Sequence, residues 1–157
     1  MRPAPALLVL ALAGALAGCN KEKIPFLGHW DGGFEVTSST AAAPVAAINM
    51  RGYLQLYRTG DKFLMELSNP VQVLDLGGKW KMVGSHRIEL TFREYKLSEP
   101  DLVKLKGMRR PFMDPADLKN AFSKPLLLDL SQDGKSLTGL LIRIGPLLGK
   151  HVFRKGT

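Results

Sequence analysis

The fold is decided by residues 48–67, INMRGYLQLYRTGDKFLMEL. From Ile48 to Leu56 every second residue is apolar or glycine, and the same alternation returns from Phe63 to Leu67. A period of two is typical of a β-strand with one buried face. Between the two runs, Thr59-Gly60-Asp61 provides turn chemistry. We therefore predict an antiparallel hairpin, with its apolar face turned towards a core.

Similar signals lie on both sides of this hairpin. We predict further strands at 30–37, 71–76, 79–82, 87–93, 126–130, 135–144 and 149–155. Gly77-Gly78 ends one of them, Gly84-Ser85 and residues 131–134 form turns, and Gly145-Pro146 breaks another. Antiparallel strands joined by short turns form either a barrel or a sandwich. Because consecutive hairpins give a simple up-and-down order, we favour an all-β fold: a small antiparallel barrel of eight or nine strands.

A longer insertion, residues 96–124, interrupts the strand pattern. Ser98 is placed to cap a helical turn that runs to Leu105, and Asp114 is placed to cap another. The residues between the two turns are basic and apolar, and we take the following as the candidate contact surface: Lys104, Lys106, Arg109, Arg110 and Phe112. The insertion could be a lid over the barrel mouth, a partner surface or a pad on anionic headgroups. Equally, it could be a set of helical turns that plugs one barrel end.

The N-terminal residues have the layout of a cleavable signal. Arg2 is followed by an apolar stretch, 6–16, which is too short to span a bilayer. The run Leu16-Ala17-Gly18-Cys19 resembles the lipobox of bacterial lipoproteins, and Cys19 is the only cysteine in the chain. That resemblance implies that diacylglycerol is attached to the Cys19 thiol and that Cys19 becomes the mature N-terminus. The alternative is an ordinary secretory leader that contains a cysteine.

This interpretation sets the domain organisation and the location. Residues 1–18 are the signal peptide, 19–25 a lipidated tether and 26–157 a single barrel domain, within a mature chain of 139 of the 157 residues. Two or more acyl chains anchor a protein durably, so we expect an extracytoplasmic domain held on a membrane. Asn20 follows the cysteine. Asp at that place resembles an inner-membrane retention signal in diderm bacteria, so Asn20 slightly favours the outer membrane.

The chain carries a net charge of +8, and removal of Arg2 with the leader leaves +7. An excess of this size favours contact with anionic surfaces, although a solvated surface that keeps the domain soluble explains many of these charges too. Arg51, Tyr53, Tyr57 and Arg58 faintly suggest an outer face for single-stranded nucleic acid. We predict no nucleic-acid partner, because a membrane-tethered domain outside the cytoplasm rarely meets one.

Gly28-His29-Trp30 begins the first strand and Arg154 lies in the last. This arrangement resembles the lipocalins, in which a tryptophan of a G-x-W motif closes the barrel bottom and an arginine of the final strand packs across it. The resemblance implies a lipocalin-like (calycin-type) barrel with Trp30 and Arg154 as its closing pair, and it raises ligand transport as one role. The middle lipocalin motif is missing, and few residues follow Arg154. The likeness therefore concerns the architecture.

The sequence holds no motif for catalysis, so we predict a non-enzymatic protein without cofactor or metal. Neither a G-x-S-x-G elbow nor an S-x-x-K pair occurs. His29 and Asp31 share a strand face, but two ligands are too few for zinc. We interpret His29, His86 and His151 as polar surface residues, while a hydrolase with a dispersed site is the least favoured alternative. The apolar interior suits either an apolar cavity or a packed core.

Together these features predict a membrane-anchored envelope lipoprotein. Its barrel would bind an apolar small molecule or a protein partner, with the insertion as the contact surface. The alternative is a structural or assembly accessory of an envelope complex that has no ligand cavity.

Overall fold

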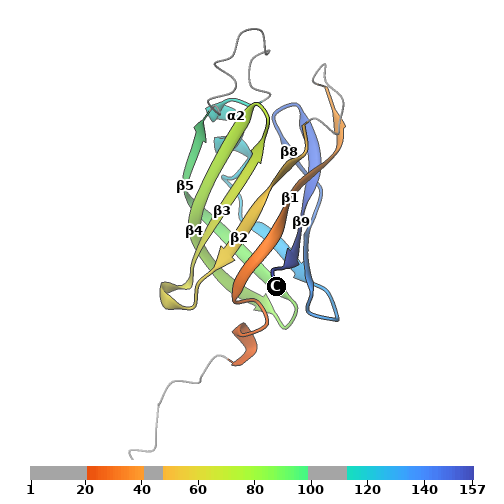
Figure 1. The fold of residues 1–157 in the computed structure, drawn as a ribbon. Coiled ribbons are helices and arrows are strands. Elements are labelled where there is room, and N and C mark those ends of the chain that lie inside the picture. Colours follow the sequence, from red (N-terminus) through yellow and green to blue (C-terminus); the bar gives the residue numbers. More distant parts are fainter. Residues whose placement is uncertain (1–20, 41–47, 99–112) are drawn as a thin grey trace, which may run out of the picture.

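The computed structural model describes residues 21–40, 48–98 and 113–157, which form a barrel of antiparallel strands (Figure 1). The strands are β1 (Gly28–Ser39), β2 (Met50–Leu56), β3 (Lys62–Asn69), β4 (Gln72–Gly84), β5 (Arg87–Ser98), β6 (Leu126–Leu130), β7 (Ser136–Gly139), β8 (Ile142–Ile144) and β9 (Leu147–Lys155). The short helical elements are η1 (Lys21–Lys23), η2 (Thr59–Asp61) and α2 (Pro115–Ala121).

Eight of these strands close into a ring. Each strand from β1 to β6 pairs with the next along the chain, β7 pairs with β9, and β9 returns to β1. β8 is an additional strand that pairs with β9. The predicted fold class, an all-β up-and-down barrel with a short helical insertion, is confirmed.

The hairpin that decides the fold forms in the expected register. In β2 and β3, Leu54 lies opposite Met65 and Leu56 lies opposite Phe63, and all four side chains are buried. The connection is η2, where Gly60 has a φ of 66°, a left-handed conformation that glycine adopts without strain. Gly52, in the middle of β2, fills another role. A Cβ atom there would lie 1.8 Å from the carbonyl oxygen of Glu66, so the backbones approach too closely for a side chain.

Two predicted strand boundaries are wrong. Residues 71–76 and 79–82 belong to one strand, β4, which continues through Gly77 and Gly78. The register with β5 shifts there, because Arg93 of β5 is an extra residue opposite the two glycines. Residues 135–144 form two strands, β7 and β8, because the chain leaves the ladder at Leu140 and Leu141. The first strand, predicted at 30–37, extends further, since Ser38 and Ser39 still pair with β9; residues 41–47 lie outside the described part.

The two helical segments next to the barrel lie at its opposite ends, η1 where β1 begins and α2 where β5 ends (Figure 1). The helix start predicted at Asp114 is confirmed. The Asp114 side chain accepts a hydrogen bond from the Asp117 backbone N–H, Asp117 returns one to the Asp114 N–H, and Pro115 occupies the first turn. Across the described ranges, no helix has both the length and the apolar character needed to cross a membrane.

Candidate functional site

The barrel interior is a packed apolar core. One continuous cluster of buried side chains runs from Phe26 to Phe153 and includes residues of every strand from β1 to β9. β8 contributes one fully buried residue, Ile144. Of the two interiors that the sequence left open, the described residues form the packed one. A binding site for a partner or ligand is therefore expected at the ends or on the outer wall of the barrel.

Trp30 closes the end of the barrel at which β1 begins. Its side chain is fully buried, and its indole N–H donates to the carbonyl oxygen of Phe26 at 2.8 Å. The cation over this ring is Lys155, whose Nζ lies 4.6 Å from the ring centroid and donates to the carbonyls of Pro25 and Leu27. The loss of water around this ammonium lowers the pKa of Lys155.

Arg154, the predicted partner of Trp30, lies on the other side of the wall. Trp30 pairs with Lys155 in the β1–β9 ladder, whereas Arg154 pairs with Asp31. Neighbouring residues of a strand point to opposite faces, so the exposed Arg154 faces outward while Lys155 shares the face of Trp30. The closing pair is therefore Trp30 and Lys155.

A second tryptophan repeats this arrangement at the same end. The Trp80 indole N–H donates to the carbonyl of Tyr57 at 2.9 Å, and Lys23 Nζ lies 5.3 Å from the Trp80 ring. Lys23 also forms a salt bridge with Asp61 at 2.8 Å. Phe26 packs against Trp80 with ring centroids 6.4 Å apart. Much of the predicted tether, 19–25, is thus held against the barrel from Lys21 onward.

The opposite end is closed by the chain that leads into α2. Gln72 and Met113 exchange hydrogen bonds, from the Gln72 side-chain amide to the Met113 carbonyl at 2.8 Å and from the Met113 N–H to Gln72 Oε1 at 3.2 Å. Leu118 of α2 and Phe122, the residue that follows the helix, are buried in the core. The end of the insertion therefore plugs the barrel, which was one of the alternatives.

His151 is an unexpected polar group inside this core. Its side chain is fully buried next to Phe34 and Phe153. The distances between ring centroids are 5.1 Å to Phe34 and 6.1 Å to Phe153. Neither ring nitrogen has a hydrogen-bond partner among the residues described. The interpretation of His151 as a surface residue is wrong, because the alternation along β9 places residues 147, 149, 151 and 153 inside.

We expect His151 to make the barrel sensitive to acid. Burial lowers the pKa of the imidazole from 6.5 to about 3, so between these values the unfolded chain binds a proton that the folded chain does not. The free energy of unfolding should therefore fall as the pH decreases, by about 2 kcal/mol at pH 5 and about 4 kcal/mol at pH 3. Denaturant unfolding across this range measures the slope.

His151→Leu should remove that slope and stabilise the barrel at neutral pH by about 1 kcal/mol, because it removes two buried nitrogens that lack partners. The exposed His86 offers a matched control, and His86→Gln should keep the acid slope of the parent. The same slope in His151→Leu would assign the acid sensitivity to other groups. Asp129 is one of these. The hydrogen bond from Arg87 lowers the pKa of its carboxyl, so its contribution is lost only below pH 3.8.

The strand wall is interrupted between β5 and β8, where α2 packs against both strands. We call this region the seam. β5 pairs with β6 only over Arg87–Leu90. From Thr91 to Ser98, β4 is its only partner among the described strands. β8 likewise pairs with β9 alone among these strands. Unpaired strand edges offer backbone donors and acceptors to another chain.

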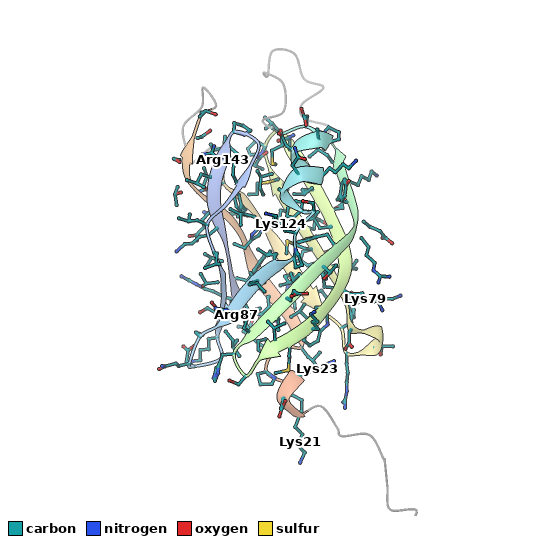
Figure 2. The ribbon with its side chains drawn as sticks, turned by 180° about the vertical axis from the view of Figure 1, so that it is seen from behind. Lys21, Lys23, Lys79, Arg87, Lys124 and Arg143 are labelled. Atoms are coloured by element: carbon teal, nitrogen blue, oxygen red, sulfur yellow. The ribbon has the colours of Figure 1, made fainter. Side chains whose placement is uncertain are left out.

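A hollow of about 400 Å³ marks the seam. Its walls are Asn120, Ala121, Phe122, Lys124, Pro125, Leu126, Ile142 and Arg143. A second hollow of about 290 Å³ adjoins it through three shared residues, Asn120, Ala121 and Arg143. Lys124 and Arg143 are both exposed and lie on the face that carries α2 (Figure 2). Leu140 and Leu141, immediately before β8, are 62% and 59% exposed. The seam therefore combines an unpaired strand edge with a hollow that is lined by both apolar and polar side chains, two of them cations.

A groove of about 660 Å³ crosses the outer face of β1, β2 and β9 and carries the polar pair noted in the sequence. Gly33 lies in its lining, between Asp31 and Glu35 and opposite Arg51. His29 and Asp31 do share a face, with Nε2 3.0 Å from the carboxylate, and His29 stacks on Tyr53. Over the described ranges, no group of three or more His, Cys, Asp or Glu residues is placed to hold a metal ion.

Several predicted site residues lie outside the described part. These are the lipobox residues Leu16, Ala17 and Gly18, the lipidation site Cys19, and the contact residues Lys104, Lys106, Arg109, Arg110 and Phe112. The insertion re-enters the described chain at Met113, beside the seam. The sequence therefore indicated the insertion as a contact surface, but it gave no signal for β8, because Lys135 to Ile144 resembles one strand.

Comparison of the chain with family models, with curated proteins and with solved structures found no match.

Proposed function

We propose that this protein is a non-enzymatic, lipid-anchored envelope lipoprotein that binds a protein partner through the seam. The observation that carries the proposal is the contrast between interior and wall. The core is packed and both barrel ends are plugged, whereas the wall at the seam has an unpaired strand edge beside a hollow lined by apolar and basic side chains.

This contrast weighs against carriage of an apolar molecule inside the barrel. Ligand sites of drug-sized molecules are concave volumes of roughly 300–1,000 Å³ that bury most of the ligand. In the described barrel the interior positions are filled by large side chains such as Trp30, Phe34, Phe63 and Trp80. Partner binding at the surface needs no such volume. The alternative role, an assembly accessory, also needs only surface binding. In that case the bound partner would be a subunit of a larger envelope complex.

The seam suits an extended segment that carries apolar and acidic side chains. An added strand at β8 would gain backbone hydrogen bonds. Its apolar side chains would cover Leu140, Leu141 and Ile142, and its carboxylates would meet Arg143 and Lys124. The basic residues of the predicted contact surface in the insertion would also favour a partner with acidic side chains. With Cys19 joined to the opposite end of the barrel, the seam lies on the part of the domain away from the anchor.

Photocrosslinking in cells tests this proposal. A photoreactive side chain placed at Leu141 should capture one partner, and peptide mapping should locate the crosslink in a segment that contains Asp or Glu. Arg143→Glu should weaken the capture about tenfold, since a favourable charge contact becomes a repulsive one. Leu64, 47% exposed on the outer face of β3, is the matched control position. Equal capture from Leu64, or capture unaffected by Arg143→Glu, would contradict binding at the seam.

A further inference from the structure

The barrel end from which Lys21 leads back to Cys19 is distinct from the rest of the surface. In an up-and-down barrel alternate connections lie at the same end, and here these are residues 57–62, 83–87 and 131–136. η1 and the end of β9 lie there as well (Figure 1). We call residues 21–24, 57–62, 83–87, 131–136 and 154–157 together the tether end.

The tether end holds the whole positive excess of the described chain. Residues 21–40, 48–98 and 113–157 contain 17 basic and 12 acidic residues, and the tether end contains eight of the basic and three of the acidic ones. The nine basic and nine acidic residues elsewhere cancel. The basic residues of the tether end are Lys21, Lys23, Arg58, Lys62, Arg87, Lys135, Arg154 and Lys155. Asp129, counted among the residues elsewhere, is paired with Arg87 at this end. With Asp129 included, the tether end carries eight basic and four acidic residues and is still the more positive part of the described chain.

Large apolar side chains are exposed among these charges. Ile24 is 56% exposed, Val83 42% and Tyr57 41%, and they come from three different segments of the tether end. Apolar and aromatic side chains surrounded by Lys and Arg are typical of surfaces that enter the boundary between headgroups and acyl chains.

The segment that would carry the anchor is fixed to this end. Lys23 is held by Asp61 and by the Trp80 ring, and Phe26 lies in the core. Lys21 is two positions after Cys19, and two fully extended residues span about 7 Å. A lipid on Cys19 would therefore bring the tether end within reach of the headgroups.

We propose that the tether end docks on the anionic surface of a phospholipid bilayer. Lys62 and Lys135 contact the lipid phosphates, while Ile24 and Val83 enter the interface. The proposal concerns a surface other than the seam and stands without a lipid on Cys19. With that lipid, docking would fix the orientation of the barrel and keep the seam away from the membrane.

Vesicle binding of an unlipidated chain tests the docking. The chain from residue 19 onward with Cys19→Ser contains the entire described core, Phe26 to Phe153, so its fold does not depend on the leader. We expect it to sediment with vesicles that contain phosphatidylglycerol, to remain in solution with vesicles of phosphatidylcholine alone, and to be released by added salt. Ile24→Ser should weaken binding and leave the salt dependence unchanged.

Charge reversal locates the surface. Lys62→Glu with Lys135→Glu should weaken binding to the anionic vesicles by at least about tenfold. The control is Lys96→Glu with Lys119→Glu, which changes the net charge equally at exposed sites outside the tether end and should alter binding less than about twofold. Circular dichroism confirms that each variant is folded.

The outcomes separate docking from anchoring. Equal losses in the two double variants, or no binding to anionic vesicles at low salt, would overturn docking even if acylated Cys19 were found in cells. Binding that depends on Lys62 and Lys135 would support docking even if Cys19 carried no lipid.

Discussion

Cys19→Ser is expected to release the mature chain from membranes. In the proposed lipoprotein the Cys19 thiol is the group that receives diacylglycerol, and the variant lacks it. Each acyl methylene that is no longer buried in the bilayer would remove about 0.8 kcal/mol of binding free energy. With at least two chains lost, detergent-phase partitioning should move the mature domain from the detergent to the aqueous phase. Mass spectrometry should find acyl groups on residue 19 of the parent and none on the variant.

The neighbouring residue provides the control for this prediction. Asn20→Ser changes a polar side chain next to Cys19 and leaves the thiol in place, so it should keep both the acyl mass and the detergent partitioning of the parent. If Cys19→Ser retained the parent's mature mass and its membrane association, the lipoprotein proposal would fail. Weak binding through the tether end remains compatible with loss of the anchor, because added salt reverses it.

The sequence predicted the barrel because strand alternation is a local property. β2 and β3 each have one buried face, so their periodicity is visible without knowledge of the partner strands. The errors arose where local signals are ambiguous. Gly77-Gly78 has the composition of a strand end, yet β4 continues through it and only the register with β5 shifts. The pairing of β4 with β5 is needed to distinguish a strand end from such a shift. Leu140 and Leu141 are apolar, so no residue pattern indicated that the chain leaves the sheet between β7 and β8.

The candidate site was less predictable, because it depends on register. Which cation reaches Trp30 follows from the pairing of β1 with β9, whose partner residues are more than 100 positions apart in the sequence. The burial of His151 follows from the same ladder and from closure of the ring. The seam depends on how far β6 accompanies β5, and no residue pattern in either strand encodes that length.

The two barrel ends illustrate how little of this arrangement is visible locally. The sequence treated 19–25 as a tether, but Lys23 and Phe26 contribute to the closure of one end. It treated 96–124 as a possible contact surface, and its last residues plug the other end before reaching the seam. Each segment combines a structural role with a position beside a candidate interaction surface.

Trp30→Ala is expected to lower the free energy of unfolding by about 3–5 kcal/mol. The change removes the largest class of core side chain at a fully buried position and leaves a cavity next to Phe26, whose carbonyl loses its indole donor. Loss of this magnitude is a large part of the stability of a domain of this size. Chemical denaturation at neutral pH measures it, with Trp80 as the remaining fluorescence probe.

Lys155 and Arg154 distinguish the observed closure from the one that the lipocalin resemblance implies. Lys155→Ala should cost about 0.5–1 kcal/mol, because it removes a partly exposed cation–π contact and two hydrogen bonds to carbonyls. Arg154→Ala, on the outer face, should change the unfolding free energy by less than about 0.5 kcal/mol. In the Trp30→Ala background the Lys155→Ala cost should largely disappear, since the two residues form one contact. A coupling of Trp30 to Arg154 in place of Lys155 would show that β9 pairs with β1 in the other register.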